Sequence, residues 1–371
     1  MKSHTDIITR DLKPDDHNQV KLLAKKAFPS TQAPFVVPGE AGGLLAEVNG
    51  SVAAVSLLRV ISLSGGRKAG FIAWLMTDPD YRGMGLASLL VKEHVEMLKS
   101  QGFDYIFTDV EGYNTGSANI FHSQGFERLS TISQLKKWSF LDLSRIWIRT
   151  GLIVDPGHFL WVFNEKARSI SQNNQRLLAV MLNWMIAILA ISLGGGLFLS
   201  GAPKFPAIEE LVATVAGIAL LFGIREGVMR LTLIKDIRSF EFRSWEGGLG
   251  ISLIIAVLFG SLFPLPGNLY PKGDGWKIRN YRKVLGRAAV ANTLTLSCIV
   301  LAASWTGLKT EIAFLQTLSF TLLFVGKPLL LFDTVVAIAP FDGFNATRLK
   351  EYNLAVWLLL TLLATGLFLF A

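Results

Sequence analysis

The sequence predicts an α/β domain followed by an all-α membrane domain, and its composition and charge support this division. Of the 371 residues, 51% are hydrophobic and only 17% are charged, whereas a soluble domain carries about 25% charged residues. Residues 1–145 hold 16 Lys and Arg against 15 Asp and Glu, but the remainder holds 20 against 13. The positive charge therefore lies in the more apolar part of the chain. This indicates a membrane protein and argues against nucleic-acid binding.

The first 140 residues alternate between strand and helix patterns. We expect strands at 6–10, 70–77 and 105–110, and an amphipathic helix at 14–28. Two further strands, at 44–48 and 52–62, are separated by Asn49-Gly50, a dipeptide that favours a tight hairpin turn.

A glycine-rich turn, in the segment PDYRGMGLASLLVKEHVEML, joins strand 70–77 to the next helix. We expect this helix to begin at Gly85 or Leu86. Backbone N–H groups at a helix N-terminus point towards a bound anion, and glycine lets a phosphate approach the backbone closely. The turn is therefore a candidate phosphate site, although R-G-M-G-L-A by itself also occurs in turns that bind nothing.

After strand 105–110, the chain carries Asn114, Phe121, Gly125 and Phe126 in the order N-x6-F-x3-G-F. Together with the glycine-rich turn, this order resembles the GNAT superfamily of acetyl-CoA-dependent N-acetyltransferases over about residues 4–140. The resemblance implies an α/β fold with a mixed, mostly antiparallel sheet and helices on both faces. It also implies acetyl-CoA as cosubstrate, with no metal.

The resemblance further implies where acetyl-CoA would bind. The family's R/Q-x-x-G-x-G/A loop falls on Arg82, Gly85 and Ala87 and would hold the pyrophosphate. The bulged strand at 75–77 would hold the thioester through backbone hydrogen bonds, and Asn114 would contact the pantetheine region. The cofactor-binding residues implied in this way are Leu75, Met76, Thr77, Arg82, Gly83, Met84, Gly85, Leu86, Ala87, Asn114 and Phe121.

Acetyl transfer needs an enzyme that positions an amine and polarises a carbonyl, because the thioester is already activated. A general base helps to remove the amine's proton. Asp109 and Glu111 are the nearest acidic candidates, with a solvated strand end as the alternative. Relatives often carry a Tyr as general acid where this chain has Phe121, which has no proton to give. His122 is a catalytic candidate only if local geometry turns it inward, and is otherwise an exposed histidine.

The predicted domains are an acetyltransferase-like domain at 1–140, a connector at 141–176 and a membrane domain at 177–371. Aromatic and basic residues are mixed around the connector, namely Trp138, Trp147, Phe159, Trp161 and Phe163 among Arg145, Arg149, Lys166 and Arg168. Two interpretations stay open. The segment lies on the membrane as an amphipathic, interfacial element, or its aromatic side chains complete the core of the first domain.

Residues 177–199 hold 23 positions without a charge, enough to cross a ~30 Å hydrocarbon core at about 1.5 Å per residue. Further apolar stretches lie at 208–229, 247–266, 288–305, 312–341 and 353–371. They predict five or six transmembrane helices. Because 247–266 is rich in Gly and Pro, it either crosses or is re-entrant. We favour re-entrance, since it places the basic loops, including 272–287, in the cytosol with the first domain.

Three motifs at about 205–352 resemble motifs of the site-2 protease family of intramembrane metalloproteases. LFGIREGVMR stands where that family has H-E-x-x-H, GRAAVANTL resembles G-P-x-x-N, and IAPFDGFN resembles P-x-D-G. Zinc needs two imidazoles one helical turn apart, but those positions hold Arg225 and Met229, while Glu226 and Asp342 remain. This implies a pseudoprotease without metal. Arg225 would then pair with Glu226 or Asp342, unless it marks the cytosolic end of a transmembrane helix. Lys327 with Pro328, and Asp333, interrupt 312–341 and would kink that stretch towards the same interior.

The sequence therefore predicts an integral protein of the cell membrane, with a cytosolic N-acetyltransferase domain. The acceptor would be a primary amine of a protein lysine or N-terminus, a small molecule or an amino-lipid, with acetyl-CoA and the lipid bilayer as further partners. The alternative is a non-catalytic, acetyl-CoA-binding sensor or adaptor with a pseudoprotease membrane domain. The missing histidines exclude an active protease. Cys298, inside an apolar run, is expected to be a small buried packing residue.

Overall fold

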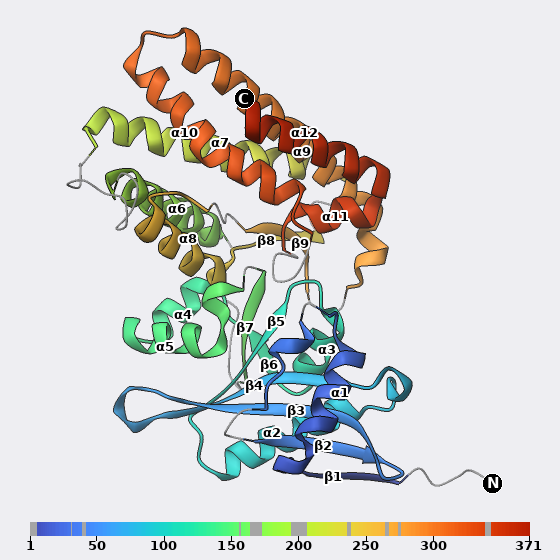
Figure 1. Ribbon diagram of the computed structural model, residues 1–371. Coiled ribbons are helices and arrows are strands. Elements are labelled where there is room, and N and C mark those ends of the chain that lie inside the picture. Colours follow the sequence, from blue (N-terminus) through green and yellow to red (C-terminus); the bar gives the residue numbers. More distant parts are fainter. Residues whose placement is uncertain are drawn as a thin grey trace.

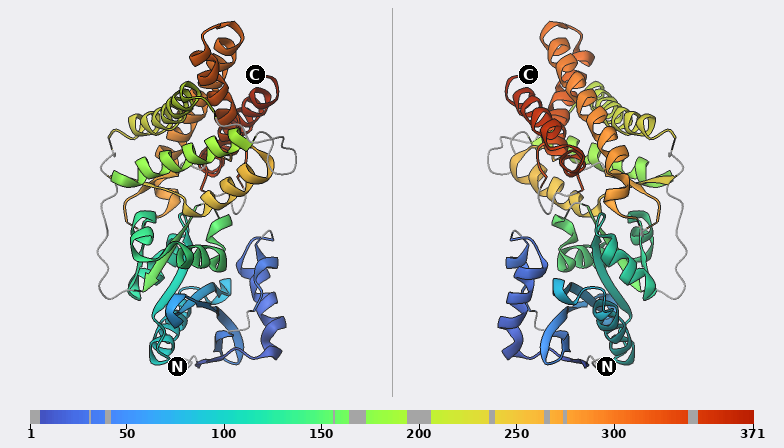
Figure 2. Two further views of the ribbon diagram at one scale, coloured as in Figure 1. Left: turned by 90° about the vertical axis from the view of Figure 1, so that its left-hand side faces the viewer. Right: turned by 90° about the vertical axis from the view of Figure 1, so that its right-hand side faces the viewer.

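The computed structural model describes residues 6–30, 32–38, 42–155, 157–163, 173–193, 206–235, 239–263, 267–273, 276–337 and 343–371. Its described residues form a sheet domain (6–163) and a helical domain (173–371), which lie one above the other (Figure 1). The two side views in Figure 2 show the same separation. The first strand, β1 (Ile7–Asp11), lies at the end of the sheet domain that is far from the helical domain.

The sheet domain is built on seven strands in the order β1-β2-β3-β4-β5-β7-β6. These strands are β1 (Ile7–Asp11), β2 (Gly43–Val48), β3 (Ser51–Ser62), β4 (Lys68–Thr77), β5 (Tyr105–Glu111), β6 (Phe126–Arg128) and β7 (His158–Phe163). Neighbouring strands are antiparallel except β4 and β5, which are parallel. The predicted mixed, mostly antiparallel sheet is therefore confirmed.

β2 and β3 form the predicted hairpin. Val48 pairs with Ser51, and the two turn residues Asn49 and Gly50 have φ values of 49° and 80°. A two-residue turn with both φ angles positive matches the right-handed twist of its strands, and Asn-Gly adopts it at little steric cost. Local sequence is therefore sufficient to set the register of this hairpin.

Helices cover both faces of the sheet, as predicted. The helices of this domain are α1 (His17–Ala27), α2 (Leu86–Ser100), α3 (Thr115–Ser123), α4 (Thr131–Lys137) and α5 (Phe140–Thr150). On one face, α2 and α3 pack against side chains such as Ile72 and Ile106. On the other face, α1 packs against Leu57, and α5 packs against Phe71 and Phe107.

The sheet extends past residue 140, where the sequence placed the end of the first domain. β7 comes from the predicted connector and lies between β5 and β6. Trp138, Phe159 and Trp161 are buried in the core, so the interpretation that the connector aromatics complete the core is confirmed for these three. The sequence pattern did not indicate β7 because both of its partner strands are distant in sequence. Residues 164–172 of the connector lie outside the described residues.

The helical domain contains seven described helices and one short antiparallel pair of strands, β8 with β9. The elements are α6 (Asn173–Leu193), α7 (Ile208–Thr232), β8 (Phe240–Arg243), α8 (Glu246–Phe259), β9 (Asn268–Pro271), α9 (Ile278–Lys309), α10 (Ala313–Thr334), α11 (Asn345–Tyr352) and α12 (Leu354–Phe370). The prediction of an all-α domain was therefore wrong at this strand pair. Each of these strands has only four residues, too few for a pattern of alternation to predict a strand reliably.

Among the described residues, α7, α9 and α10 are long and apolar enough to cross a membrane, fewer than the five or six helices predicted. The apolar parts of α6, α8 and α12 are shorter; α12, with 17 residues, rises about 26 Å. The helix α6 ends at Leu193, and 194–199 of its predicted crossing lie outside the described residues. In the segment 247–266, α8 has 14 residues and ends at Phe259. Re-entrance of this segment stays a prediction.

Cys298 is exposed on α9, so the prediction of a buried packing residue was wrong. Leu294 and Leu301 are also exposed, at 47% and 51%. These three residues recur at helical spacing and share one outward face of α9. An apolar run in a membrane-type helix contains such outward positions as well as packed ones, and sequence alone does not separate the two.

Candidate active site

β4 and β5 pair over only part of their length. Their parallel register ends at Ile72 and Thr108, where Thr108 Oγ1 donates a hydrogen bond to the carbonyl oxygen of Ile72 at 3.0 Å. Beyond this point β4 continues to Thr77 along β3, while β5 continues to Glu111 along β7. The sheet therefore opens at the carboxyl ends of two parallel strands, which is a common place for ligands in α/β folds.

β4 carries an extra residue at the point where it leaves β5. Leu57 of β3 pairs with Trp74, but Leu58 pairs with Ile72, so Ala73 has no partner on β3. A bulge of this kind bends the strand and increases its twist, which helps to separate β4 from β5. The sequence placed the bulge at 75–77, whereas it lies at Ala73.

The glycine-rich turn follows β4 and leads into α2, which begins at Leu86 after Gly85, as predicted. Gly83 and Gly85 have φ values of 87° and 79°, which are strained for residues with a side chain. No atom lies within 4 Å of the position a Cβ would take on either glycine. Open space therefore lies beside both glycines, at a helix N-terminus of the kind that can bind a phosphate. Binding of a pyrophosphate by residues 82–87 stays a prediction.

The other predicted cofactor residues differ in exposure. Asn114 is exposed, and its Oδ1 accepts the backbone N–H of Ser117 at 3.2 Å, which caps α3. Phe121 is buried and packs edge-to-face on Phe126, with ring centroids 5.2 Å apart. Met76 is also buried, in the core beneath α1. The side chains of Phe121 and Met76 therefore serve the core, and their predicted role towards a cofactor stays a prediction.

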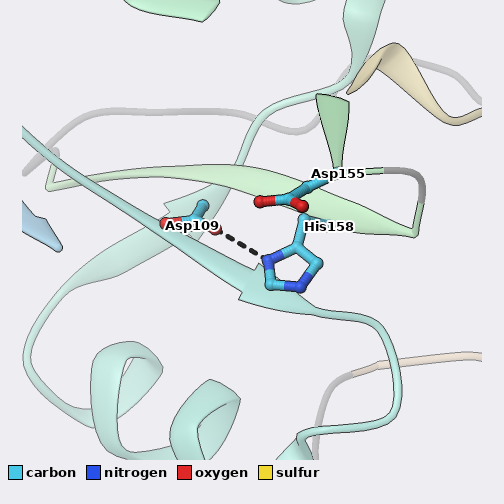
Figure 3. A group of neighbouring side chains, drawn as sticks. All are labelled: Asp109, Asp155 and His158. Atoms are coloured by element: carbon cyan, nitrogen blue, oxygen red, sulfur yellow. Dashed lines mark hydrogen bonds and ion pairs between the residues drawn. The ribbon is translucent and has the colours of Figure 1, made fainter. Parts of the chain in front are cut away.

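An acid and a histidine meet beside the opening. Asp109 is the first residue of β5 after its last pairing with β4, and its Oδ2 lies 2.7 Å from Nδ1 of His158 on β7 (Figure 3). The Asp155 carboxylate lies on the same side of the ring, and the ligand atoms of the three residues are all within 4.8 Å of one another. Figure 3 shows Nε2 directed away from both carboxylates. This nitrogen can therefore accept or give a proton.

The charge on His158 follows from its neighbours. Burial of the ring lowers the pKa of His158, but the hydrogen bond to Asp109 and the charges of Asp109, Asp155 and Glu111 outweigh burial and raise it to about 9. Burial raises the pKa of Asp155, and the charge of Asp109 adds to this effect, while His158 opposes it. At neutral pH the histidine is therefore an imidazolium paired with Asp109. Its Nε2 lone pair becomes available as the pH approaches 9.

Of the predicted catalytic residues, Asp109 belongs to this cluster. Glu111 Oε1 accepts the backbone N–H of Tyr113 at 2.9 Å and so closes the turn after β5. His122 is exposed on α3, so the inward orientation that a catalytic role required is absent. His158 was missed because it lies 49 residues after Asp109, in a segment interpreted as a connector. The prediction that the domain uses no metal stays a prediction.

The helical domain fixes the turn that follows β5. Arg348 on α11 donates from Nε to the Tyr113 hydroxyl at 2.6 Å and from Nη1 to Asn268 Oδ1 at 3.0 Å. Gly112 lies against the ring of Tyr270 on β9, which leaves no room for a Cβ. Burial raises the pKa of Tyr113, although the Arg348 charge opposes it, so the phenol stays neutral. The opening in the sheet therefore ends at a turn that both domains build.

A second charged cluster lies inside the helical domain. Arg225 on α7 is 2% exposed, and its Nε and Nη2 each donate to the Asp333 carboxylate on α10 at 3.0 Å. Asn292 on α9 donates to Asp333 Oδ2 at 2.7 Å, and Asn345 donates to the carboxylate through its backbone and side chain at 3.0 and 2.9 Å. Four helices therefore meet at one buried carboxylate.

This cluster corrects the predicted partner of Arg225. The sequence favoured Glu226 or Asp342, but the partner is Asp333, 108 residues away along the chain. Glu226 pairs instead with Arg230 at 2.6 Å, one helical turn along α7. Asp342 lies outside the described residues. The alternative that Arg225 marks the surface end of a helix is also wrong, because its side chain is buried. Asp333 is one of the residues predicted to kink 312–341 towards the interior; its side chain is buried, and the kink stays a prediction.

The fold and site of the sheet domain define the class of protein. A mixed sheet that opens between two parallel strands, beside a glycine-rich helix N-terminus, is typical of a domain that binds a phosphate-bearing ligand. Residues 9–126 match the model of the acetyltransferase (GNAT) family. These residues therefore form a GNAT acetyltransferase domain, and acetyl-CoA is the cosubstrate of that family. The matched segment includes Asp109 but ends before His158.

Three of the solved structures to which parts of this chain are similar are the following. Arabidopsis thaliana Naa50, in complex with a bisubstrate analogue, is 20% identical, with 42% of this chain and 96% of that chain covered and a TM-score of 0.31. The Escherichia coli ribosomal-protein-S18-alanine N-acetyltransferase is 16% identical, with 45% and 99% covered and a TM-score of 0.31. E. coli YhbS in complex with CoA is 24% identical, with 34% and 72% covered and a TM-score of 0.29. No curated protein matches the chain.

Proposed function

We propose that the protein is a membrane-tethered N-acetyltransferase that transfers the acetyl group of acetyl-CoA to a primary amine. The observation that carries this proposal is the opening between β4 and β5, with the glycine-rich turn at its mouth and the Asp109–His158 pair beside it. The family match of residues 9–126 supports the reaction class. The length and apolarity of α7, α9 and α10 support anchoring in a membrane, with the sheet domain and the basic loops in the cytosol.

The two faces of the sheet give the two substrates separate approaches. The glycine-rich turn leads into α2, which covers one face, so acetyl-CoA would enter from that side. Side chains alternate along a strand, so Asp109 projects from the same face as Phe107, the face on which α5 packs. The acceptor amine would approach from this second face and would meet the base there. The thioester would lie in the opening between the two approaches.

In the proposed reaction, acetyl-CoA supplies an activated acyl group: the C–N bond forms as the C–S bond breaks. Nε2 of His158 accepts the proton that the amine loses. Asp109 holds Nδ1, which orients the ring and stabilises the imidazolium that results. Phe121 carries no acidic proton, so the departing thiolate takes its proton from water. Backbone N–H groups at the end of β4 would polarise the thioester carbonyl.

The second candidate function is a non-catalytic sensor that binds acetyl-CoA. The burial of Phe121 in the core favours it, because no side chain at that position can protonate the leaving thiolate. In this case the glycine-rich turn would bind the cosubstrate, and the helical domain would transmit its presence to a membrane partner. The two candidates differ in turnover and agree in acetyl-CoA binding.

We also propose that the helical domain is an inactive relative of the site-2 protease family. Residues of all three motifs meet at one point, since Arg225 of the first, Asn292 of the second and Asn345 of the third donate hydrogen bonds to Asp333. Under this proposal, the Arg225 guanidinium would stand where that family has a zinc-binding histidine, as in a fold kept after the metal was lost. Stoichiometric, tightly held zinc in the purified protein would contradict this proposal.

The experiment for the main proposal measures acetyl-CoA turnover by the full chain in detergent. The acceptor panel contains a lysine peptide, a peptide with a free N-terminus, a polyamine and phosphatidylethanolamine, with the free thiol and the acetylated product as readouts. Gly85→Glu is the control, because it forces a side chain into positive φ and places a carboxylate where the phosphate would lie. We expect turnover that Gly85→Glu abolishes. Acetyl-CoA binding without turnover on any amine would instead support the sensor.

A further inference from the structure

The helix α5 is apolar on two opposite faces. Leu143 and Ile146 are 3% and 0% exposed and pack into the core of the sheet domain. On the other side, Leu141 and Ile148 are 55% and 59% exposed, and Phe140, at the helix start, is 84% exposed. Leu141 and Ile148 are seven residues apart and so lie on one face, two turns from each other. Folding of the sheet domain explains the inner face of α5 and leaves the outer one without a partner.

Positive charges surround the outer face of α5. Arg145 and Arg149 are exposed on α5, and Lys136 and Lys137 are exposed at the end of α4. Asp142 is the one acidic residue of α4 and α5, and its buried carboxylate is hydrogen-bonded within the sheet domain. Arg145 pairs with Asp142 at 3.6 Å, so the outer surface of these two helices combines apolar side chains with an excess of cations, four against one acid. This combination is typical of a surface that binds anionic lipid headgroups and the underlying acyl boundary.

This outer face is continuous with the apolar helices of the helical domain. The 3₁₀ turn Leu152–Val154, which follows α5, packs on α8, and Ile153 lies so close to Gly250 that no Cβ would fit there. Figure 1 shows α4 and α5 beside α6 and α8, and α4 contacts α6. The neighbouring helix α8 exposes its own apolar residues, namely Leu253 and Ile254 at 46% each and Phe259 at 59%.

We propose that α5 and the end of α4 lie in the anionic headgroup layer of the bilayer that the helical domain spans, with Phe140, Leu141 and Ile148 at the acyl boundary. This inference rests on the membrane anchoring proposed above. Anchoring by α7, α9 and α10 holds the sheet domain at the membrane, so α5 docks without the entropic cost of bringing a free protein to the surface. Of the aromatic residues that suggested an interfacial segment, Trp138, Phe159 and Trp161 are in the core, and a different set would face the lipid.

Docking of α5 also orients the acceptor side of the site. The helix packs on the sheet face that carries Phe107, and Asp109 projects from that same face. Next to His158, Gly157 lies against Gly343 of the helical domain, with their Cα atoms too close for a side chain between them. The candidate base therefore lies at the junction of the two domains. The acceptor class that fits this position is an amine held at the bilayer surface.

The test uses the full chain with Cys298→Ser and a single new cysteine, labelled with an environment-sensitive fluorophore. The probe position is Ile148→Cys, and the matched control is Leu22→Cys on α1, whose side chain has a similar exposure of 61%. Each labelled protein is reconstituted into phosphatidylcholine vesicles with and without phosphatidylglycerol. The phosphatidylcholine carries either native or brominated acyl chains, which quench fluorophores near them.

We expect the emission maximum of the label at position 148 to shift to shorter wavelength on reconstitution. Its fluorescence should be mostly quenched in brominated vesicles, while the label at position 22 changes little in either respect. Omitting phosphatidylglycerol, or adding Arg145→Gln with Arg149→Gln, should reduce the quenching at position 148. Equal quenching at the two positions in protein that resists alkaline carbonate extraction would overturn the docking and leave the anchoring intact. Release of the protein by carbonate would overturn both.

A functional comparison tests docking without a label. Leu141→Ser with Ile148→Ser removes apolar area from the outer face and leaves the core residues of α5 unchanged. We expect this variant to keep wild-type turnover on a soluble amine in detergent and to lose turnover on a vesicle-bound amine. An equal loss on both acceptors would show that these side chains serve the fold and would overturn the docking.

Discussion

The two charged clusters of this chain differ in how fully their polar atoms are used. In the helical domain, Asp333 is 0% exposed and accepts five hydrogen bonds, two of them from Arg225. In the sheet domain, the side chains of His158 and Asp109 are 22% and 12% exposed, and one contact joins them. A buried, saturated cluster fixes structure, because any change leaves a charge without a partner. A partly exposed pair, in which His158 Nε2 is directed away from both carboxylates, can exchange a proton with a substrate.

The largest expected effect comes from breaking the saturated cluster. Arg225→Met leaves the Asp333 charge buried without its cation, so we expect the free energy of unfolding to fall by about 3–5 kcal/mol. Thermal unfolding of the full chain in detergent would measure the loss. The double variant Arg225→Met with Asp333→Leu removes both charges and should recover much of the stability.

Arg230→Met is the matched control for Arg225→Met. Arg230 also pairs with a carboxylate on α7, but the side chains of Arg230 and Glu226 are 30% and 18% exposed, so water compensates for the lost partner. We expect a change of less than about 1 kcal/mol. Equal destabilisation by the two variants would contradict the structural role assigned to the buried cluster.

The second largest effect is expected on turnover, when the partly exposed pair of His158 and Asp109 is broken. His158→Gln keeps a polar side chain beside Asp109 but removes the basic nitrogen, so we expect kcat to fall by about 10²–10⁴-fold. The unfolding midpoint should change far less than it does for Arg225→Met. Steady-state assays with the best acceptor of the panel would measure kcat. His122→Gln, an exposed histidine on α3, is the control, and wild-type turnover in both variants would refute the role of His158.

The pH dependence of turnover sharpens the assignment of the base. The pKa of His158 is raised to about 9, so log(kcat/KM) should rise with pH and level off near pH 9, as the imidazolium loses its proton. Asp109→Asn removes the main cause of this raised pKa, so the inflection should move to lower pH. The inflection should stay in place when the acceptor is exchanged for an amine of different pKa. An inflection that follows the acceptor would assign the titration to the amine.

The same pKa predicts the opposite trend for stability. His158 binds its proton more tightly in the folded state, with a pKa of about 9 against the usual 6.5. Its contribution to stability is therefore complete below pH 6.5 and is lost as the pH rises through 9. We expect the difference in unfolding midpoint between wild type and His158→Gln to shrink over this range. A difference that does not vary with pH would contradict the ion pair.

The smallest expected effect is at the domain junction. Tyr113→Phe removes the hydroxyl that accepts from the buried Arg348 Nε at 2.6 Å. Loss of a hydrogen bond to a charged group costs about 1.5–3 kcal/mol, and it loosens the turn before Asn114. We expect the KM for acetyl-CoA to rise a few-fold, with kcat nearly unchanged. Tyr105→Phe is the control, since its hydroxyl accepts from Arg67 at 3.3 Å within the sheet domain. An equal rise in KM for both variants would refute the specific role of the junction.

The sequence by itself determined the local elements of the sheet domain. The predicted strands, the Asn49-Gly50 hairpin and the start of α2 at Leu86 agree with the structure. Side-chain alternation, turn chemistry and glycine with positive φ act over a few neighbouring residues, so they can be read without the rest of the chain. The motif that indicated an acetyltransferase also lies within one strand, turn and helix.

Only the tertiary structure decided the contacts between distant residues. It placed β7 between β5 and β6, brought His158 to Asp109 and paired Arg225 with Asp333. It also decided which apolar residues are covered, so Trp138 is in the core while Phe140 is exposed. The physical reason is that these outcomes depend on which surfaces meet after folding. A residue's own neighbours in sequence carry no information about a partner 49 or 108 positions away.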